Sequence, residues 1–182
     1  MSKLYEEITP ELQAWIDQQK VFFVATAPAG VEGHINCSPK GLDSLRVLGP
    51  RSVGYIDLTG SGAETIAHLQ ENGRVCLMFC ALSGPPKIVR LHGAGTVITP
   101  DAPAWATLAD QFPDYPSARS IIRVDATRIS DSCGYGVPRY EFADDRDTLT
   151  TWADKKGANA VTDFQQEHNL ESIDGLPALN PK

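Results

Sequence analysis

The sequence has no long apolar run, no surplus of basic residues and no clustered cysteines or histidines. No stretch approaches the roughly 20 apolar residues that a membrane-spanning helix needs. A formal charge of -7 argues against broad binding to DNA or RNA, which requires a basic face. Residues 1–16 are polar and acidic, unlike a signal peptide. We therefore expect a cytoplasmic protein without membrane or nucleic-acid partners.

The four cysteines form no CxxC pair, which is typical of reduced thiols in a cytosolic protein. Cys76 and Cys80 share one predicted strand, where four residues span about 13 Å, beyond the reach of a disulfide. Cys37 is the third cysteine. Cys133, in a glycine-rich loop, is the only thiol that we expect to be accessible. It has no neighbouring base in the sequence, so we expect it to be structural.

Signatures of metal and hydrolase chemistry are also missing. The four histidines show no HxxxH or HExxH spacing, and no GxSxG segment occurs, so we expect no metal site. The sequence identifies no catalytic residue.

With 182 residues, 42% of them hydrophobic and 21% charged, the chain can bury a core without disulfide or metal support. We expect residues 1–145 to form one domain and residues 146–182 to add a helix and an extended tail packed on that domain.

Short β-branched and aromatic runs predict the strands, and helical spacing predicts the helices. The expected strands are 21–27, 34–38, 52–58, 74–82, 88–98, 119–129 and a short one around 140–142. The expected helices are 63–72, 100–112, 146–168 with Gly157 as a weak point, and one from Pro10 with Thr9 as its N-cap. Strands do not alternate strictly with helices, which favours a mainly β (α+β) antiparallel barrel over a parallel sheet.

The segment from Thr59 through Gly60 and Ser61 to Gly62 stands between a strand and a helix start. Glycines let backbone N–H groups turn toward an anion, and a helix N-terminus adds positive potential. Ser61 and Thr65 add hydroxyl groups. A capped helix after a tight turn explains the same pattern equally well, because the segment matches neither a Walker loop nor GxGxxG.

Three basic residues are candidates for holding an anion. Arg46 has apolar neighbours, which suggest partial burial, and a buried arginine needs an anionic partner. Lys40 lies in a Pro- and Gly-containing loop, where lysines are usually solvated. Arg90 and His92 share one strand face, and their alternation does not decide whether that face is exposed or lines a cleft.

The motifs HINCSPKG, RVLGP, DLTGSGAET, GPPKIVRLHG and SDSCGYGVP stand in a familiar order. Over about residues 15–140 the chain resembles the pyridoxamine 5'-phosphate oxidase-like, FMN-binding split-barrel superfamily, and within it an uncharacterised branch. The resemblance implies an antiparallel split β-barrel that binds FMN. It also implies a homodimer with flavin sites at the interface.

The resemblance places Arg46, Val47 and Leu48 along the flavin. At the helix start the superfamily has a pair of cationic residues, and in this sequence Glu64 and Thr65 occupy those two positions. The resemblance therefore implies that other groups must supply the positive charge that this pair would provide. The expected cofactor-binding residues are Ser38, Lys40, Arg46, Val47, Leu48, Leu58, Thr59, Gly60, Ser61, Thr65 and Arg90.

The function that the resemblance implies is an FMN-dependent oxidoreductase acting on an unknown small molecule. No Arg-x-His element follows Arg139, which argues against true pyridoxamine 5'-phosphate oxidase activity. A non-catalytic flavin or haem module for storage or sensing is the alternative, with His92 as the candidate haem ligand. A deazaflavin in place of FMN also stays open.

Overall fold

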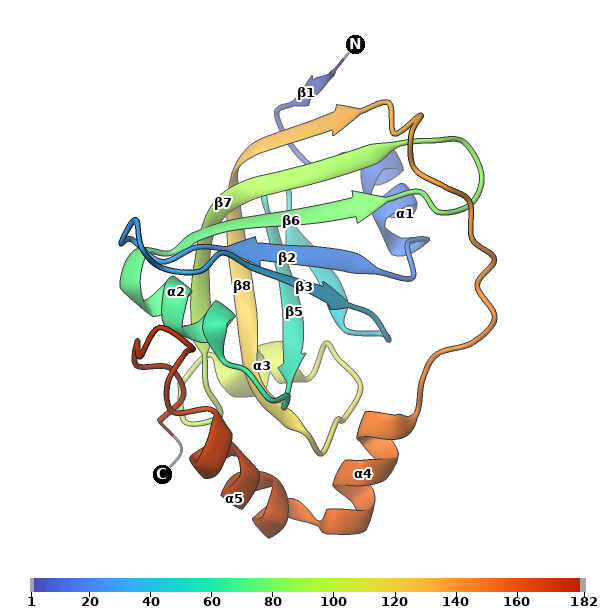
Figure 1. The fold of residues 1–182 in the computed structure, drawn as a ribbon. Helices are drawn as coiled ribbons and strands as arrows, with labels where there is room; N and C mark the ends of the chain where they lie inside the picture. Colours follow the sequence, from blue (N-terminus) through green and yellow to red (C-terminus); the bar gives the residue numbers. More distant parts are fainter. Residues whose placement is uncertain (1, 181–182) are drawn as a thin grey trace.

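The computed structural model describes residues 2–180, which form one strongly curved antiparallel sheet with helices at its ends (Figure 1). The strand order is β3-β2-β6-β7-β8-β5-β4, and β1 pairs with β8. The strands are β1 (Leu4–Tyr5), β2 (Phe22–Thr26), β3 (Asn36–Lys40), β4 (Leu45–Gly49), β5 (Ser52–Leu58), β6 (Arg74–Cys80), β7 (Ile88–Ile98) and β8 (Ala118–Ser132).

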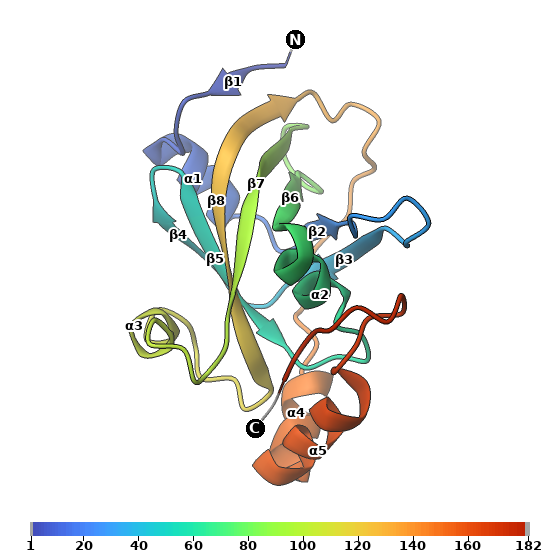
Figure 2. The ribbon, with the colours of Figure 1, turned by 90° about the vertical axis from the view of Figure 1, so that its left-hand side faces the viewer.

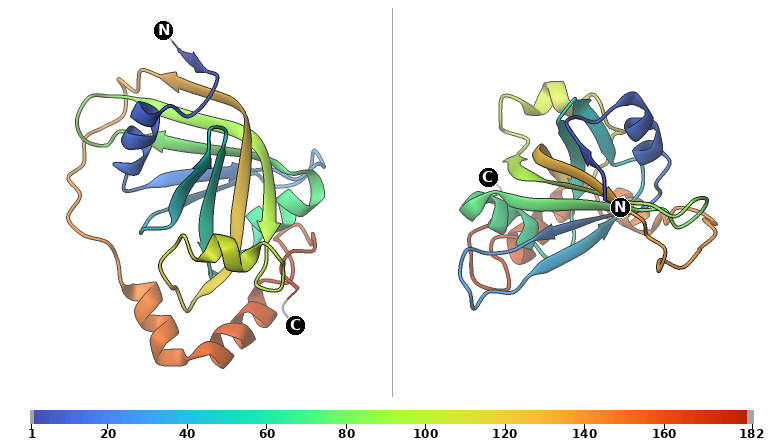
Figure 3. Two further views of the ribbon diagram at one scale, coloured as in Figure 1. Left: turned by 180° about the vertical axis from the view of Figure 1, so that it is seen from behind. Right: turned by 90° about the horizontal axis from the view of Figure 1, so that it is seen from above.

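The two longest strands, β7 and β8, hold the two halves of the sheet together. They pair with each other from Ile88 to Ile98, whereas β6 extends one side and β5 the other. The views from behind and from above show how the sheet coils around its interior (Figure 3). This arrangement confirms the expected antiparallel split barrel.

The helices are α1 (Pro10–Asp17), α2 (Glu64–Asn72), α3 (Trp105–Ala109), α4 (Thr148–Lys156) and α5 (Ala158–His168). Leu12 and Ile16 of α1 and Ile66 of α2 are buried in the main core with the inward residues of the strands. A smaller apolar cluster forms beneath α3. Alternation of the strands thus directs one face into the core.

Local signals account for several element boundaries. The Leu12 N–H donates to the Thr9 hydroxyl at 3.3 Å, and Pro10 occupies the first turn, so the predicted start of α1 is confirmed. Gly73 ends α2 with a φ of 72°. Gly157, with a φ of 78°, divides the predicted 146–168 helix into α4 and α5.

Other sequence predictions were wrong. Residues 140–142 form no strand: residues 138–147 run as an exposed connection, and the Tyr140 N–H donates to the Leu82 carbonyl oxygen, beyond the end of β6, at 2.8 Å. Lys40 lies inside β3 and not in a loop. Strand β4 was missed, since its five half-buried residues show no alternation. Cys37 is exposed like Cys133, because β3 is the edge strand, so Cys133 is not the only accessible thiol.

The C-terminal segment returns to the barrel after the exposed connection. Helices α4 and α5 lie below the sheet, and residues 169–180 run beside α2 (Figures 1 and 2). In this tail the Asp174 carboxylate accepts a hydrogen bond from Nδ1 of the His34 ring at 2.7 Å. Within residues 2–180, no helix is both long and apolar enough to cross a bilayer.

The sheet bends at a bulge between His92 and Gly93, where the register of β7 against β8 shifts. A Cβ atom on Gly93 would collide with the Asp125 carbonyl oxygen and lie 2.9 Å from the Ala126 Cα. Both obstacles are backbone atoms, so a side chain there cannot be accommodated by a rotamer change.

We predict that Gly93→Ala lowers the free energy of unfolding by about 1–3 kcal/mol, the usual cost of overpacking. Gly136→Ala is the matched control, because its Cβ would meet nothing within 4 Å. Urea unfolding of both variants measures the difference, and equal stability would contradict the proposed close approach.

Candidate functional site

A small pocket of about 260 Å³ opens where β5 ends and α2 begins. Four segments contribute to it: β3, the end of β5, the 59–62 loop with the first turn of α2, and the start of β8. Its lining consists of Ser38, Lys40, Leu58, Gly60, Ser61, Gly62, Glu64, Thr65 and Arg119.

The N-terminus of α2 supplies partial positive charge at this pocket. Its N-cap residue, Ala63, has no side-chain hydrogen bond to the helix. The first turn of a helix leaves backbone N–H groups without internal partners, and such groups favour an anion.

Two cations meet at one buried carboxylate beside the pocket. Lys40 Nζ and Arg119 Nε donate to the two Asp57 oxygens, each at 2.8 Å, and the Asp57 side chain is 0% exposed. Burial alone would raise the pKa of Asp57. The nearby charges and hydrogen bonds of Lys40 and Arg119 outweigh it and hold that pKa below its usual range.

The side chains at the pocket are close to electrically neutral. The charges of Lys40 and Arg119 face those of Asp57 and Glu64, whose carboxylate also lies at the start of α2. Attraction of an anion therefore depends strongly on the uncapped helix amides and on hydroxyl groups. Thr65 keeps its hydroxyl in place by accepting a 2.9 Å hydrogen bond from Asn36 Nδ2.

Six residues expected from the sequence line this pocket together: Ser38, Lys40, Leu58, Gly60, Ser61 and Thr65. Thr59 has a different position. It is 2% exposed, and its hydroxyl donates to the Ser117 carbonyl oxygen at 2.8 Å, so it anchors the loop from behind.

Arg46 is not brought to the pocket. Its guanidinium donates to Asp43 at 2.8 Å and to the Gln111 carbonyl oxygen at 2.7 Å, and it lies near the Phe112 ring. The neighbouring Val47 and Leu48 are also outside the pocket lining.

Arg90 and His92 lie on the half-buried outer face of the sheet. Arg90 donates to the Ser132 hydroxyl at 3.1 Å, and the His92 ring lies 3.9 Å from the Cys76 sulfur. Burial, together with the charges of Arg90 and Arg128, lowers the pKa of His92.

Sequence reasoning missed Arg119. Like Arg46, Arg119 is an arginine with apolar residues near it in the sequence, here in the segment RSII. Its role becomes visible only when β8 pairs with β5, which places Ser120 opposite Asp57.

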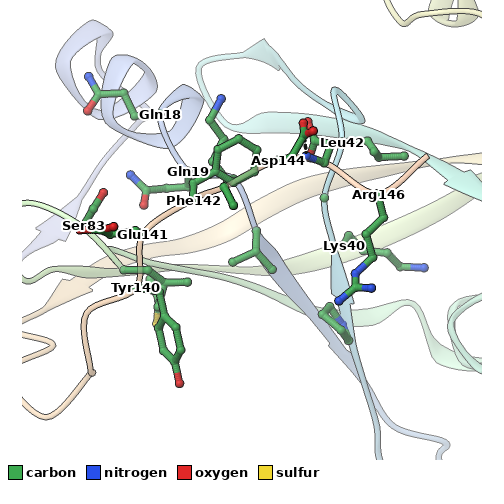
Figure 4. Close-up of a pocket in the computed structure, with 18 residues that line it drawn as sticks. Gln18, Gln19, Lys40, Leu42, Ser83, Tyr140, Glu141, Phe142, Asp144 and Arg146 are labelled. Atoms are coloured by element: carbon green, nitrogen blue, oxygen red, sulfur yellow. Dashed lines mark hydrogen bonds between the residues drawn. The ribbon is translucent and has the colours of Figure 1, made fainter. Parts of the chain in front are cut away.

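A second, larger cavity of about 630 Å³ lies between the exposed connection, residues 18–21 before β2, and the ends of strands β3 and β6. Figure 4 shows Tyr140, Phe142, Asp144 and Arg146 of the connection, which line this cavity together with Lys40. Lys40 lines both cavities, so the two hollows adjoin at this residue.

A family model described as pyridoxamine 5'-phosphate oxidase matches residues 8–133. The chain belongs to the pyridoxamine 5'-phosphate oxidase family. It is 37% identical over 197 residues to ustO, a pyridoxamine 5'-phosphate oxidase family protein of Aspergillus flavus. That match covers 99% of this chain and 79% of ustO.

Solved structures support the same fold for this family member. HupZ from Group A Streptococcus has a TM-score of 0.53 and 23% identity, covering 67% of this chain and 91% of HupZ. A FAD-binding protein of Mesorhizobium loti has a TM-score of 0.50 and 14% identity, covering 72% of this chain and 96% of that protein. At these identities the likeness establishes the fold alone.

We predict that Asp57→Asn destabilises the protein by about 3–5 kcal/mol at pH 7, because the buried Arg119 and the partly buried Lys40 lose their counter-charge. The folded-state pKa of Asp57 is lowered. Its contribution is therefore fully present above the unfolded value of about 3.9 and is lost as pH falls through the folded pKa.

The stability gap between wild type and Asp57→Asn should consequently shrink below about pH 4. Urea unfolding at a series of pH values measures this gap, and the other acidic groups are common to both proteins. A gap that stays constant down to pH 2 would contradict the ion-paired state of Asp57.

Proposed function

We propose that this protein is a homodimeric FMN-binding flavoprotein that acts as an oxidoreductase on a small molecule. The observation that carries the proposal is the pocket at the uncapped start of α2, where Lys40 and Arg119 also lie. Family membership adds a reason to consider a flavin, and the pocket's donors suit a phosphate group.

The residues at the pocket fit one phosphate monoester. The hydroxyl groups of Ser61 and Thr65 and the amides of the first helical turn are donors of the kind that phosphate oxygens accept, whereas the Ser38 hydroxyl already donates to Asn36 Oδ1 at 2.9 Å. The volume of about 260 Å³ and the balanced side-chain charge favour one phosphate over a pyrophosphate. For this reason we propose FMN and not a flavin dinucleotide.

When bound, the flavin would supply the transfer of hydride or electrons, which no side chain of this chain can perform alone. The chain's own residues would hold the phosphate, and Lys40 would place a positive charge between the two adjoining cavities. The larger cavity is of the size that small organic ligands occupy, 300–1,000 Å³. We propose it as the space for the substrate.

The outer face of the sheet supports the proposed homodimer. Phe23 of β2 is aligned with Pro39 and Met78, and Ala25 with Cys37 and Cys76. These side chains are half-buried or exposed in the single chain, although most are apolar. A second copy placed on this face would remove them from water.

The first test is the visible spectrum of the purified protein after incubation with FMN and removal of excess ligand. A bound flavin spectrum that NADH or NADPH bleaches supports the oxidoreductase proposal. Flavin binding without bleaching by any reductant would favour a storage module. A Soret band, or no binding of FMN, would overturn the choice of cofactor.

We predict that Lys40→Gln weakens FMN binding about tenfold or more, because a charge-assisted hydrogen bond contributes about 1.5–3 kcal/mol. Arg46→Gln removes the same charge outside the pocket and should change the dissociation constant less than about twofold. Calorimetric titration compares the variants. The reverse order of effects would show that the phosphate lies at Arg46.

A further inference from the structure

One buried side-chain amide at the end of helix α5 contacts the pocket at the start of α2, which we call the anion pocket. Asn169, directly after the helix, is 0% exposed. Its Oδ1 accepts from Arg119 Nη1, and its Nδ2 donates to the Gly60 carbonyl oxygen, both at 2.8 Å. One side chain from the C-terminal segment thus contacts both a cation and a loop residue of the pocket.

One turn earlier, Gln165 holds the adjacent loop residue. Its Nε2 donates to the Thr59 hydroxyl at 2.8 Å, and that hydroxyl in turn donates to the Ser117 carbonyl oxygen. Thr59 and Gly60 are therefore both tied to α5. Such contacts reduce the conformational freedom of a glycine-rich loop, which would otherwise have to be ordered when a ligand binds.

The contacts of Arg119 orient its guanidinium. Its Nε donates to Asp57, and its Nη1 donates to the Gly62 carbonyl oxygen and to Asn169. Among residues 2–180, none accepts a hydrogen bond from its remaining nitrogen, Nη2. Because Arg119 lines the pocket, this nitrogen is the one left for an anionic ligand.

We propose that Asn169 is a positioning residue of the anion pocket, which holds Arg119 and the 59–62 loop ready for a phosphate monoester. The inference rests on the proposed function for the identity of the ligand. Coupling is reciprocal, so a bound phosphate must also stabilise the docking of α5 against the loop. The C-terminal segment is then part of the binding site and not a passive cover.

A substitution elsewhere in the tail provides a control, because it weakens the attachment of the tail at a contact that does not involve Asn169. Asp174 accepts from the His34 ring at 2.7 Å and from the His34 backbone N–H at 2.8 Å, outside the pocket. Asp174→Asn weakens this attachment and leaves Asn169, Arg119 and the loop unchanged. Gln166→Ala alters an exposed side chain of the same helix turn.

The experiment measures the dissociation constants of FMN and of inorganic phosphate for wild type, Asn169→Ala, Asp174→Asn and Gln166→Ala. We expect Asn169→Ala to weaken both ligands about tenfold, a change of about 1.4 kcal/mol, and the two controls to stay within about twofold. Hydrogen exchange of the α5 amides gives a second measurement. FMN should slow exchange in wild type and in both controls, but not in Asn169→Ala.

Unchanged affinity in Asn169→Ala would overturn the inference while leaving the proposed function intact. Equal losses in Asn169→Ala and Asp174→Asn would also overturn it, since general docking of the tail would then be responsible. Should wild type bind phosphate but not FMN, the proposed cofactor fails, and the phosphate titrations still decide the role of Asn169. Wild type that binds neither ligand would overturn both.

Discussion

The buried ion pairs of Asp57 are the interaction on which the rest of the site depends. Asp57 comes from β5, Lys40 from the edge strand β3 and Arg119 from the start of β8. A carboxylate without solvent requires such partners, because an isolated buried charge costs several kcal/mol. The same contacts bring both cations to the loop at the end of β5, where the pocket forms.

Most of the positive charge at the pocket is neutralised by neighbouring carboxylates. Asp57 and Glu64 balance Lys40 and Arg119, so the pocket is not a strongly cationic trap. Recognition of the proposed phosphate would then depend on geometry: uncapped amides, hydroxyls and a guanidinium held by Asn169. A neutral, preorganised pocket of this kind favours one compact anionic group over any negatively charged surface.

Much of the fold could be predicted from local signals. Thr9 and Pro10 marked the start of α1, and Gly157 marked the break between α4 and α5. Strand β4 escaped prediction because its half-buried residues do not alternate. The expected strand at 140–142 did not form: the segment is exposed, and its Tyr140 N–H donates to Leu82, which lies beyond the end of β6.

The sequence by itself determined the 59–62 loop, with its glycines, its hydroxyls and its place between a strand and a helix, because these are local properties. Only the tertiary structure decided which cations lie beside this loop. Lys40 and Arg119 are 79 residues apart in number, and Asn169 lies 50 residues beyond Arg119. Strand register and the return of the C-terminal helix bring them together, and neither is encoded in the neighbours of any one of these residues.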